Sequence, residues 1–140
     1  MAYKTNLQKA VTNTNQALKE GKLDDIHPYE VNGSFIRSFL PPGEIPHVGC
    51  DHVFMPANTS LPPHLHQRSK TYLLVTSGRG YGIIGDQHIS IKKGDIICIE
   101  PQVVHSFSTE SESIEFISIQ SPPISDENGN VDYVLMLSVE

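Results

Sequence analysis

Two histidines separated by a single residue are the feature of this sequence best suited to chemistry. His64-Leu65-His66 lies in the stretch PPHLHQRSKTYLLVTSGRG, residues 62–80. On a β-strand, residues i and i+2 point to the same face, so these two imidazoles would stand side by side about 7 Å apart at the backbone, close enough to share one metal ion. With 7 histidines in 140 residues, such a pair also arises by chance, so it needs support from its surroundings.

Length, composition and charge limit the class of protein to which the chain can belong. A chain of 140 residues with 38% hydrophobic and 19% charged residues is typical of one globular domain with a real core. The formal net charge of −6 argues against a general binder of nucleic acid or of an anionic membrane, since both need a basic face. No apolar run approaches 18 residues and the N-terminus has no apolar signal core, so we expect a cytoplasmic protein. Cys50 and Cys98 do not make a disulfide framework.

The N-terminal part carries the one clear helical pattern of the chain. An apolar stripe over residues 6–20 predicts a short α-helix, with Thr5 and Gln8 as a capping box and Gly21 as its end. The stripe is thin, so we expect this helix to lie outside the main body or against a partner subunit. Residues 1–30 are therefore predicted to be a helix and connector, and residues 31–140 the main domain.

From residue 31 onward, short alternating runs separated by glycine and proline turns predict strands. Turn signals include Ser77-Gly78, Gly85-Asp86, Gly94-Asp95 and Asn128-Gly129. Strands at this spacing indicate an all-β sandwich or barrel. The predicted strands are 34–40, 48–55, 64–67, 71–77, 80–84, 87–92, 95–99, 103–108, 114–120 and 132–138.

A third histidine, His105, follows these turns in the sequence Glu100-Pro-Gln-Val-Val-His105-Ser-Phe. The order of a His-x-His strand leading to Gly78, then the Gly94-Asp95 turn, a proline and a single histidine resembles the two motifs of the cupin superfamily. The resemblance covers about residues 50–110. It implies a double-stranded β-helix, that is, a jelly-roll barrel whose interior holds the ligands.

The same resemblance implies a metal site. His64, His66 and His105 match the three histidines with which cupins hold one divalent ion, here zinc, iron, nickel or manganese. The acidic ligand that follows the first pair in cupins is missing, because its place falls at Lys70 or Thr71. Three imidazoles suit catalytic zinc, and imidazole also suits iron and nickel.

Two interpretations of this pocket stay open at the level of sequence. In the first, a three-histidine metal site serves an enzyme of the isomerase, lyase or dioxygenase type, which acts on a small oxygen-rich molecule such as a sugar or acid. Tyr72, Glu100 and His52 are then the candidates for proton transfer. These three residues and Gln67 are also candidates for a fourth ligand. In the second, the histidines line a metal-free pocket, and Lys70, if it points inward, opposes cation binding.

Other expectations concern partners and single residues. The partner is expected to be a small molecule, with no nucleic acid and no membrane, and pairing through a sheet would make a homodimer. Cys98, within an apolar run, is expected to be buried. Arg37 and Arg79 either reach the barrel mouth or solvate a strand face. The polar residues 126–132 lack the glycine and glutamate that a calcium loop requires, so a hairpin loop is expected there.

Overall fold

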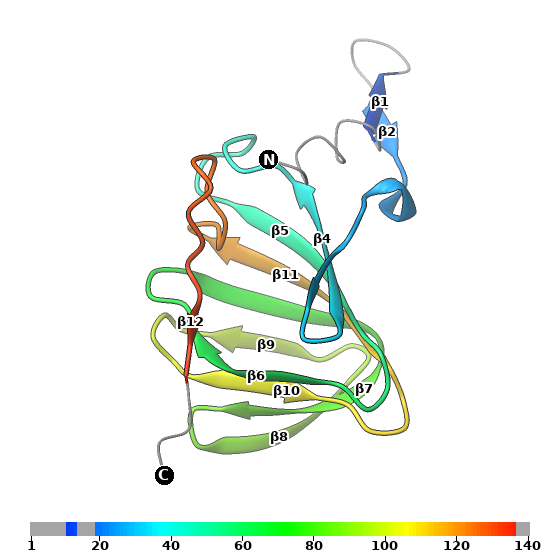
Figure 1. Cartoon of the computed structure of the whole chain (residues 1–140), viewed down its shortest axis with the longest axis vertical. Helices are drawn as coiled ribbons and strands as arrows, with labels where there is room; N and C mark the ends of the chain where they lie inside the picture. The colour runs from blue at the N-terminus through cyan, green and yellow to red at the C-terminus, as the bar shows by residue number, and fades with distance from the viewer. Residues whose placement is uncertain (1–10, 14–18, 137–140) are drawn as a thin grey trace.

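The computed structural model describes residues 11–13 and 19–136. Within them, one ten-stranded sheet curls into an open barrel, and β1 and β2 form a small ladder apart from it (Figure 1). The one helical element is the 3₁₀ turn η1 (Leu23–Asp25), and no helix in the described part could cross a membrane. The strands are β1 (Val11–Asn13), β2 (Lys19–Gly21), β3 (Tyr29–Val31), β4 (Ser34–Leu40), β5 (Gly49–Met55), β6 (Ser60–Leu65), β7 (Lys70–Ile84), β8 (Gln87–Lys92), β9 (Ile96–Ile99), β10 (His105–Ser108), β11 (Ile114–Ser121) and β12 (Val134–Leu135).

The long strand β7 joins the two halves of the barrel. Its first part pairs with β9 and β11, and β5, β4 and β3 extend that half. Its second part pairs with β8 and β10, and β6 and β12 extend the other half. Gly78 lies between the parts with φ of 77°, and a Cβ there would come within 1.9 Å of the Ser113 carbonyl oxygen. Only glycine fits this corner.

Alternation along the strands sends one set of side chains into the barrel. The buried apolar set comes from both halves of the sheet, which is how a curled sheet makes a core. At one end Ile114 pairs with Met55, and both are almost completely buried. The cluster comprises Val53, Met55, Leu61, Leu73, Val75, Ile91, Ile99, Phe107, Ile114 and Phe116.

The all-β barrel expected from the turn spacing is confirmed, but the N-terminal helix is not seen. Residues 11–13 pair antiparallel with residues 19–21. The physical reason lies in Val11, Thr12 and Asn13, since β-branched residues and asparagine are poor helix formers and the apolar stripe was too thin to compensate. Residues 6–10 and 14–18 of the predicted helix lie outside the described part of the chain.

A second expectation fails at Cys98. This side chain is exposed, as is Ile96 at 70% of its surface. The run Ile96–Ile99 looked buried because it is continuously apolar, yet β9 covers the interior with one face only. Ile99 faces inward, and the opposite face of β9 is open to solvent.

Candidate metal centre and pocket

Three imidazoles from adjacent strands meet inside the barrel. His64 lies in β6, His66 directly follows it, and His105 in β10 is the register partner of His64. The ring centroids are 4.2 Å apart for His64 and His105 and 5.2 Å apart for each of the other two pairs. One ring nitrogen from each residue lies within 4.8 Å of the others. In the described residues, this is the cluster arranged to hold a metal ion.

A β-bulge between β6 and β10 turns the side chain of His64 into the pocket. His105 pairs with His64 and Phe107 pairs with Leu61, so three steps on β6 oppose two steps on β10. The additional residue falls at Pro62-Pro63, where the missing N–H groups do not interrupt a hydrogen-bond ladder. Because of this bulge, Leu61 and His64 both face inward although they are three residues apart.

Backbone carbonyl groups fix the tautomer of each imidazole. The Nδ1 atom lies 2.8 Å from the Pro62 carbonyl oxygen in His64 and 2.9 Å from the Val103 carbonyl oxygen in His105. In His66 the same atom lies 2.5 Å from the carbonyl oxygen of Asp132. A carbonyl oxygen can only accept, so each Nδ1 carries the proton and each Nε2 keeps its lone pair. This is the arrangement that metal-ligating histidines adopt.

Burial favours the neutral form of His64 and of His105. It lowers the pKa of His105 to about 3, and the electrostatic repulsion between protonated His64 and protonated His105 adds to the effect. Burial likewise lowers the pKa of His64, while its hydrogen bond to Pro62 offsets part of this. At neutral pH both imidazoles are therefore unprotonated at Nε2 and compete for a metal ion without first losing a proton.

The C-terminal segment secures the site through Asp132. Its carboxylate accepts backbone hydrogen bonds from Gln67 at 2.6 Å, Arg68 at 2.8 Å and Ser69 at 3.0 Å, and its carbonyl oxygen holds His66. Burial by itself would raise the pKa of Asp132, but these backbone donors hold it below its usual value. One residue thus fixes both the turn after β6 and the orientation of a candidate ligand.

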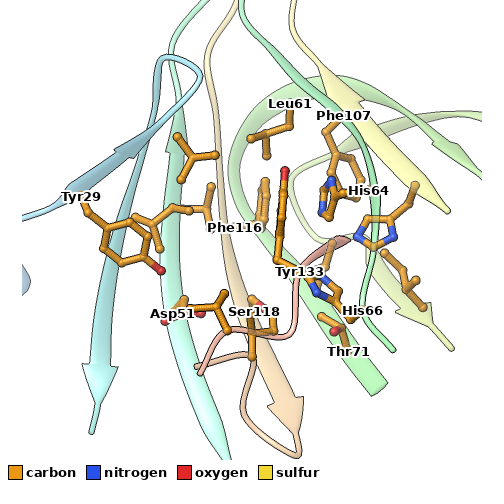
Figure 2. A pocket seen from close by; sticks show the side chains of 18 residues that line it. Tyr29, Asp51, Leu61, His64, His66, Thr71, Phe107, Phe116, Ser118 and Tyr133 are labelled. Atoms are coloured by element: carbon orange, nitrogen blue, oxygen red, sulfur yellow. The ribbon is translucent and has the colours of Figure 1, made fainter. Parts of the chain in front are cut away.

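The imidazoles form one end of a cavity of about 350 Å³. Tyr133 lies between the two walls in Figure 2, with its ring stacked on His64 at a centroid distance of 4.5 Å. Asp51 of β5 and Ser118 of β11 line the cavity from the other half of the sheet, and in Figure 2 they lie level with His66 and Thr71. Apolar side chains make up most of the remaining surface: Val31, Ile36, Val53, Leu61, Leu73, Ile99, Phe107, Phe116, Ile124 and Val131.

Thr71, not Lys70, occupies the position next to the imidazoles. Thr71 is buried and lines the pocket beside His66, and its Oγ1 has no hydrogen-bond partner (Figure 2). Lys70 points outward, because neighbouring residues on a strand alternate, and its Nζ lies 3.1 Å from Glu100. The ammonium group that could repel a cation is therefore outside the barrel.

The structure does not bring the predicted proton-transfer residues to this pocket. Tyr72 is exposed on the outer face of β7, and Glu100 pairs with Lys70 on the same side. His52 is buried, but on the face of β5 away from the pocket, with Nε2 at 3.3 Å from Glu115. Gln67, considered as a fourth ligand, is exposed.

The two arginines considered at the barrel mouth are likewise elsewhere. Arg37 donates from Nε to the Ile26 carbonyl oxygen at 2.9 Å, and Arg79 pairs with Glu112 at 3.2 Å. Neither lines the pocket.

Sequence reasoning passed over five polar residues of this site, one of which is Tyr29 in β3. Asp51 and Ser118 could have been found, because they alternate with Val53 and Phe116 on strands that were predicted. Asp132 and Tyr133 carry no local signal, since their approach to His66 and His64 depends on how the C-terminal segment crosses the barrel. The loop before them is the expected polar hairpin, in which Asp126 accepts hydrogen bonds from Asn128 and Asn130.

Comparison with known proteins agrees with this geometry. The family described as "Cupin domain" matches residues 51–120, half of the chain, and these residues include all three histidines. The chain belongs to the cupin family. Over 112 residues, this cupin is 27% identical to a Methanocaldococcus jannaschii protein named "Uncharacterized protein MJ1618", covering 77% of this chain and 90% of that protein.

Solved structures of other proteins share the fold. The nucleoside dehydratase Pac13 from Streptomyces has a TM-score of 0.65 and 16% identity, with 85% of this chain and 91% of Pac13 covered. A predicted oxalate decarboxylase from Thermotoga maritima has a TM-score of 0.67 and 15% identity, with 72% of this chain and 96% of that protein covered. At these identities the likeness concerns the fold.

Proposed function

We propose that this cupin holds one divalent metal ion with His64, His66 and His105 and uses it to bind, and to act on, a small molecule through a chelating oxygen. The observation that carries this proposal is the common tautomer of the three rings. Each Nδ1–H is engaged with a backbone carbonyl group, which leaves three Nε2 lone pairs for a shared partner.

The donor set fits such an ion. Three neutral imidazoles suit zinc, iron or nickel, and they leave coordination positions for a ligand. Lys70 lies outside the barrel, so no ammonium group of the described pocket wall opposes the charge. When bound, the ion would supply Lewis-acid polarisation of a ligating oxygen or, as iron, dioxygen chemistry.

The chain's own residues would prepare the pocket for this task. The barrel walls exclude water around the imidazoles, which strengthens every polar interaction inside. Thr71 Oγ1 and the Tyr133 hydroxyl group are buried without hydrogen-bond partners. Each is a group whose desolvation a bound ligand would compensate. Asp132 orients His66 through the carbonyl group of its backbone.

The structural neighbours add general support. Pac13, a nucleoside dehydratase, is described with uridine bound, and the Thermotoga maritima neighbour is a predicted oxalate decarboxylase. Both names concern small-molecule chemistry, so we propose a small-molecule substrate for this chain as well. The second candidate function is a metal-free binding module, favoured by Thr71 at the place where the cupin resemblance leads one to expect an acidic ligand.

Metal analysis separates the two candidates. We expect tag-free protein to bind one equivalent of zinc or nickel per chain in a calorimetric titration, and His64→Ala and His105→Ala to weaken binding by about 100-fold or more. His88→Ala is the matched control, since His88 is exposed on β8 and away from the pocket. If the metal content is substoichiometric and does not change in the His64→Ala and His105→Ala variants, the metal-free binding module is favoured. In that case a ligand should stabilise the protein without metal.

We also propose that the exposed apolar face around β9 pairs with a second copy of the chain. Tyr72, Leu74, Ile96 and Ile119 are exposed on adjacent strands β7, β9 and β11. Neighbouring surface also carries both signs of charge, such as Lys70 and Glu100, which suits a two-fold interface in which each patch meets its own copy. Light scattering should give a molar mass of two chains for the wild-type protein. For the Ile96→Lys variant it should give the mass of a single chain.

A further inference from the structure

A second hollow lies on the outer surface of the barrel, over β8, the second part of β7 and β10, which are neighbouring strands in Figure 1. Its volume is about 400 Å³, and it shares no lining residue with the histidine pocket. Because residues that pair across antiparallel strands point to the same face, the register sets its side chains in two rows. One row is Ser90, Tyr81 and Ser108, and the other is His88, Ile83 and Ser106.

The centre of this outer hollow is apolar, and its margins carry hydrogen-bonding groups. Tyr81 and Ile83 on β7 are exposed at 40% and 39% of their surface. Hydroxyl groups lie on both sides of them, from Ser90 on β8 and Ser108 on β10, and Ser60 continues the same row on β6. These side chains make no hydrogen bond or ion pair within the described part of the chain. Their donors and acceptors are therefore available to a ligand.

The outer hollow is also free of formal charge. Among its lining residues there is no carboxylate, ammonium or guanidinium group. Arg79 and Lys92 lie one row beyond it, and Arg79 is already paired with Glu112. A protein surface that is merely solvated carries about 25–35% charged residues. An uncharged patch with several hydroxyl groups suits a neutral polar ligand better than an anion or a cation.

The size and composition of the outer hollow argue against a protein partner. A standard protein interface has about 20–30 residues on each side and is depleted in serine. Here eight residues line the hollow, and three of them are serines. The outer face around β9 has the contrasting, apolar composition that suits a second copy of the chain: Tyr72, Leu74, Ile96 and Ile119.

We propose that the outer hollow is a second binding site of this protein, and that it takes one neutral sugar ring. The apolar C–H face of the ring would stack on Tyr81 and Ile83. The sugar hydroxyl groups would exchange hydrogen bonds with Ser90, Ser108 and His88. A volume of about 400 Å³ corresponds to on the order of thirteen water-sized groups at about 30 Å³ each, which is the size of one hexose. The site is independent of the metal centre.

Titration of the metal-free full chain, followed by NMR of its backbone amides, tests this site. Cellobiose, maltose, lactose and mannobiose are the probes, and sorbitol is the control, because it has hydroxyl groups but no ring. We expect at least one disaccharide to cause saturable shifts confined to residues 81–83, 88–90 and 106–108, with an affinity at least tenfold above that of sorbitol. If none of the four sugars saturates, or if sorbitol binds equally well, the proposal is overturned.

Side-chain variants test the contacts. Tyr81→Ala should weaken sugar binding at least tenfold, because the ring loses its stacking surface. The matched control is Tyr72→Ala, which removes a tyrosine of similar exposure, 48%, from the other outer face and should leave the affinity unchanged. Ser108→Ala should weaken binding about fivefold. Unchanged affinity in both Tyr81→Ala and Ser108→Ala would overturn the proposal. So would shifts that map to His64 and His105, or shifts at the hollow that depend on protein concentration alone, since these identify the barrel pocket and a second copy as the binding partners.

Discussion

His105 should make the stability of the metal-free protein depend on pH. Burial places its folded-state pKa at about 3, against 6.5 for the free side chain. The folded protein therefore binds fewer protons than the unfolded chain between these values, so the free energy of unfolding falls as the pH falls from 6.5 toward 3. Over the whole interval the loss approaches 5 kcal/mol, at about 1.36 kcal/mol per pKa unit.

Between pH 7.5 and pH 5.0 the linkage relation gives a loss of about 2 kcal/mol from this one residue. The assay is urea unfolding in EDTA, followed by far-UV circular dichroism, since the chain contains no tryptophan. The His105→Gln variant lacks the titrating ring. Between pH 7.5 and pH 5.0, its free energy of unfolding should therefore fall by about 2 kcal/mol less than that of the wild-type protein. Exposed His88 provides the control variant, His88→Gln, which should keep the wild-type pH dependence.

The difference between variants isolates His105 from the other titrating groups. The lowered pKa of His64 acts in the same direction, and the raised pKa of Asp51, caused by burial, acts in the opposite direction. Both groups remain in wild type and variant. Parallel pH profiles for the wild type and His105→Gln would refute the reasoning, because they would mean that the folded site holds a solvated or protonated His105.

Three further outcomes follow from single contacts. Gly78→Ala should lower the free energy of unfolding in urea by more than 2 kcal/mol, because it combines a positive φ with a steric clash. Gly94 also has a positive φ but open space around it, so Gly94→Ala should lower the free energy of unfolding by only about 1 kcal/mol. Asp132→Asn should weaken zinc binding about tenfold in calorimetry, because the turn next to His66 loses its charged acceptor. Tyr133→Phe should raise the melting temperature of the metal-free protein by removing a buried, unpaired hydroxyl group, a gain of up to about 1 kcal/mol. A lower melting temperature for this variant would show that the hydroxyl group has a partner.

The barrel was predictable from sequence because its determinants are local. Alternation and turn glycines predicted residues 34–40 and 87–92 as strands, and the structure has strands at those positions. The corner at Gly78 merged two other predicted strands into the single strand β7. The N-terminal helix was mispredicted, because a thin apolar stripe is weak against the low helix propensity of residues 11–13.

The three histidines were identified from type and spacing, because the period of a β-strand and the cupin motif order both point to them. What the sequence left open was which of Lys70 and Thr71 faces the site. Only the strand register decides this, since a shift of one residue exchanges the two faces. The register turns Thr71 inward and Lys70 toward Glu100.

The sequence by itself determined the strand pattern and the three imidazoles, because both depend on residues close together along the chain. The far wall and the tautomers were decided only by the tertiary structure. Asp132 and Tyr133 reach His66 and His64 from a segment more than sixty residues away, and Asp51 comes from the opposite half of the barrel. No local pattern encodes such contacts, because they exist only when the curled sheet brings distant strands around one cavity.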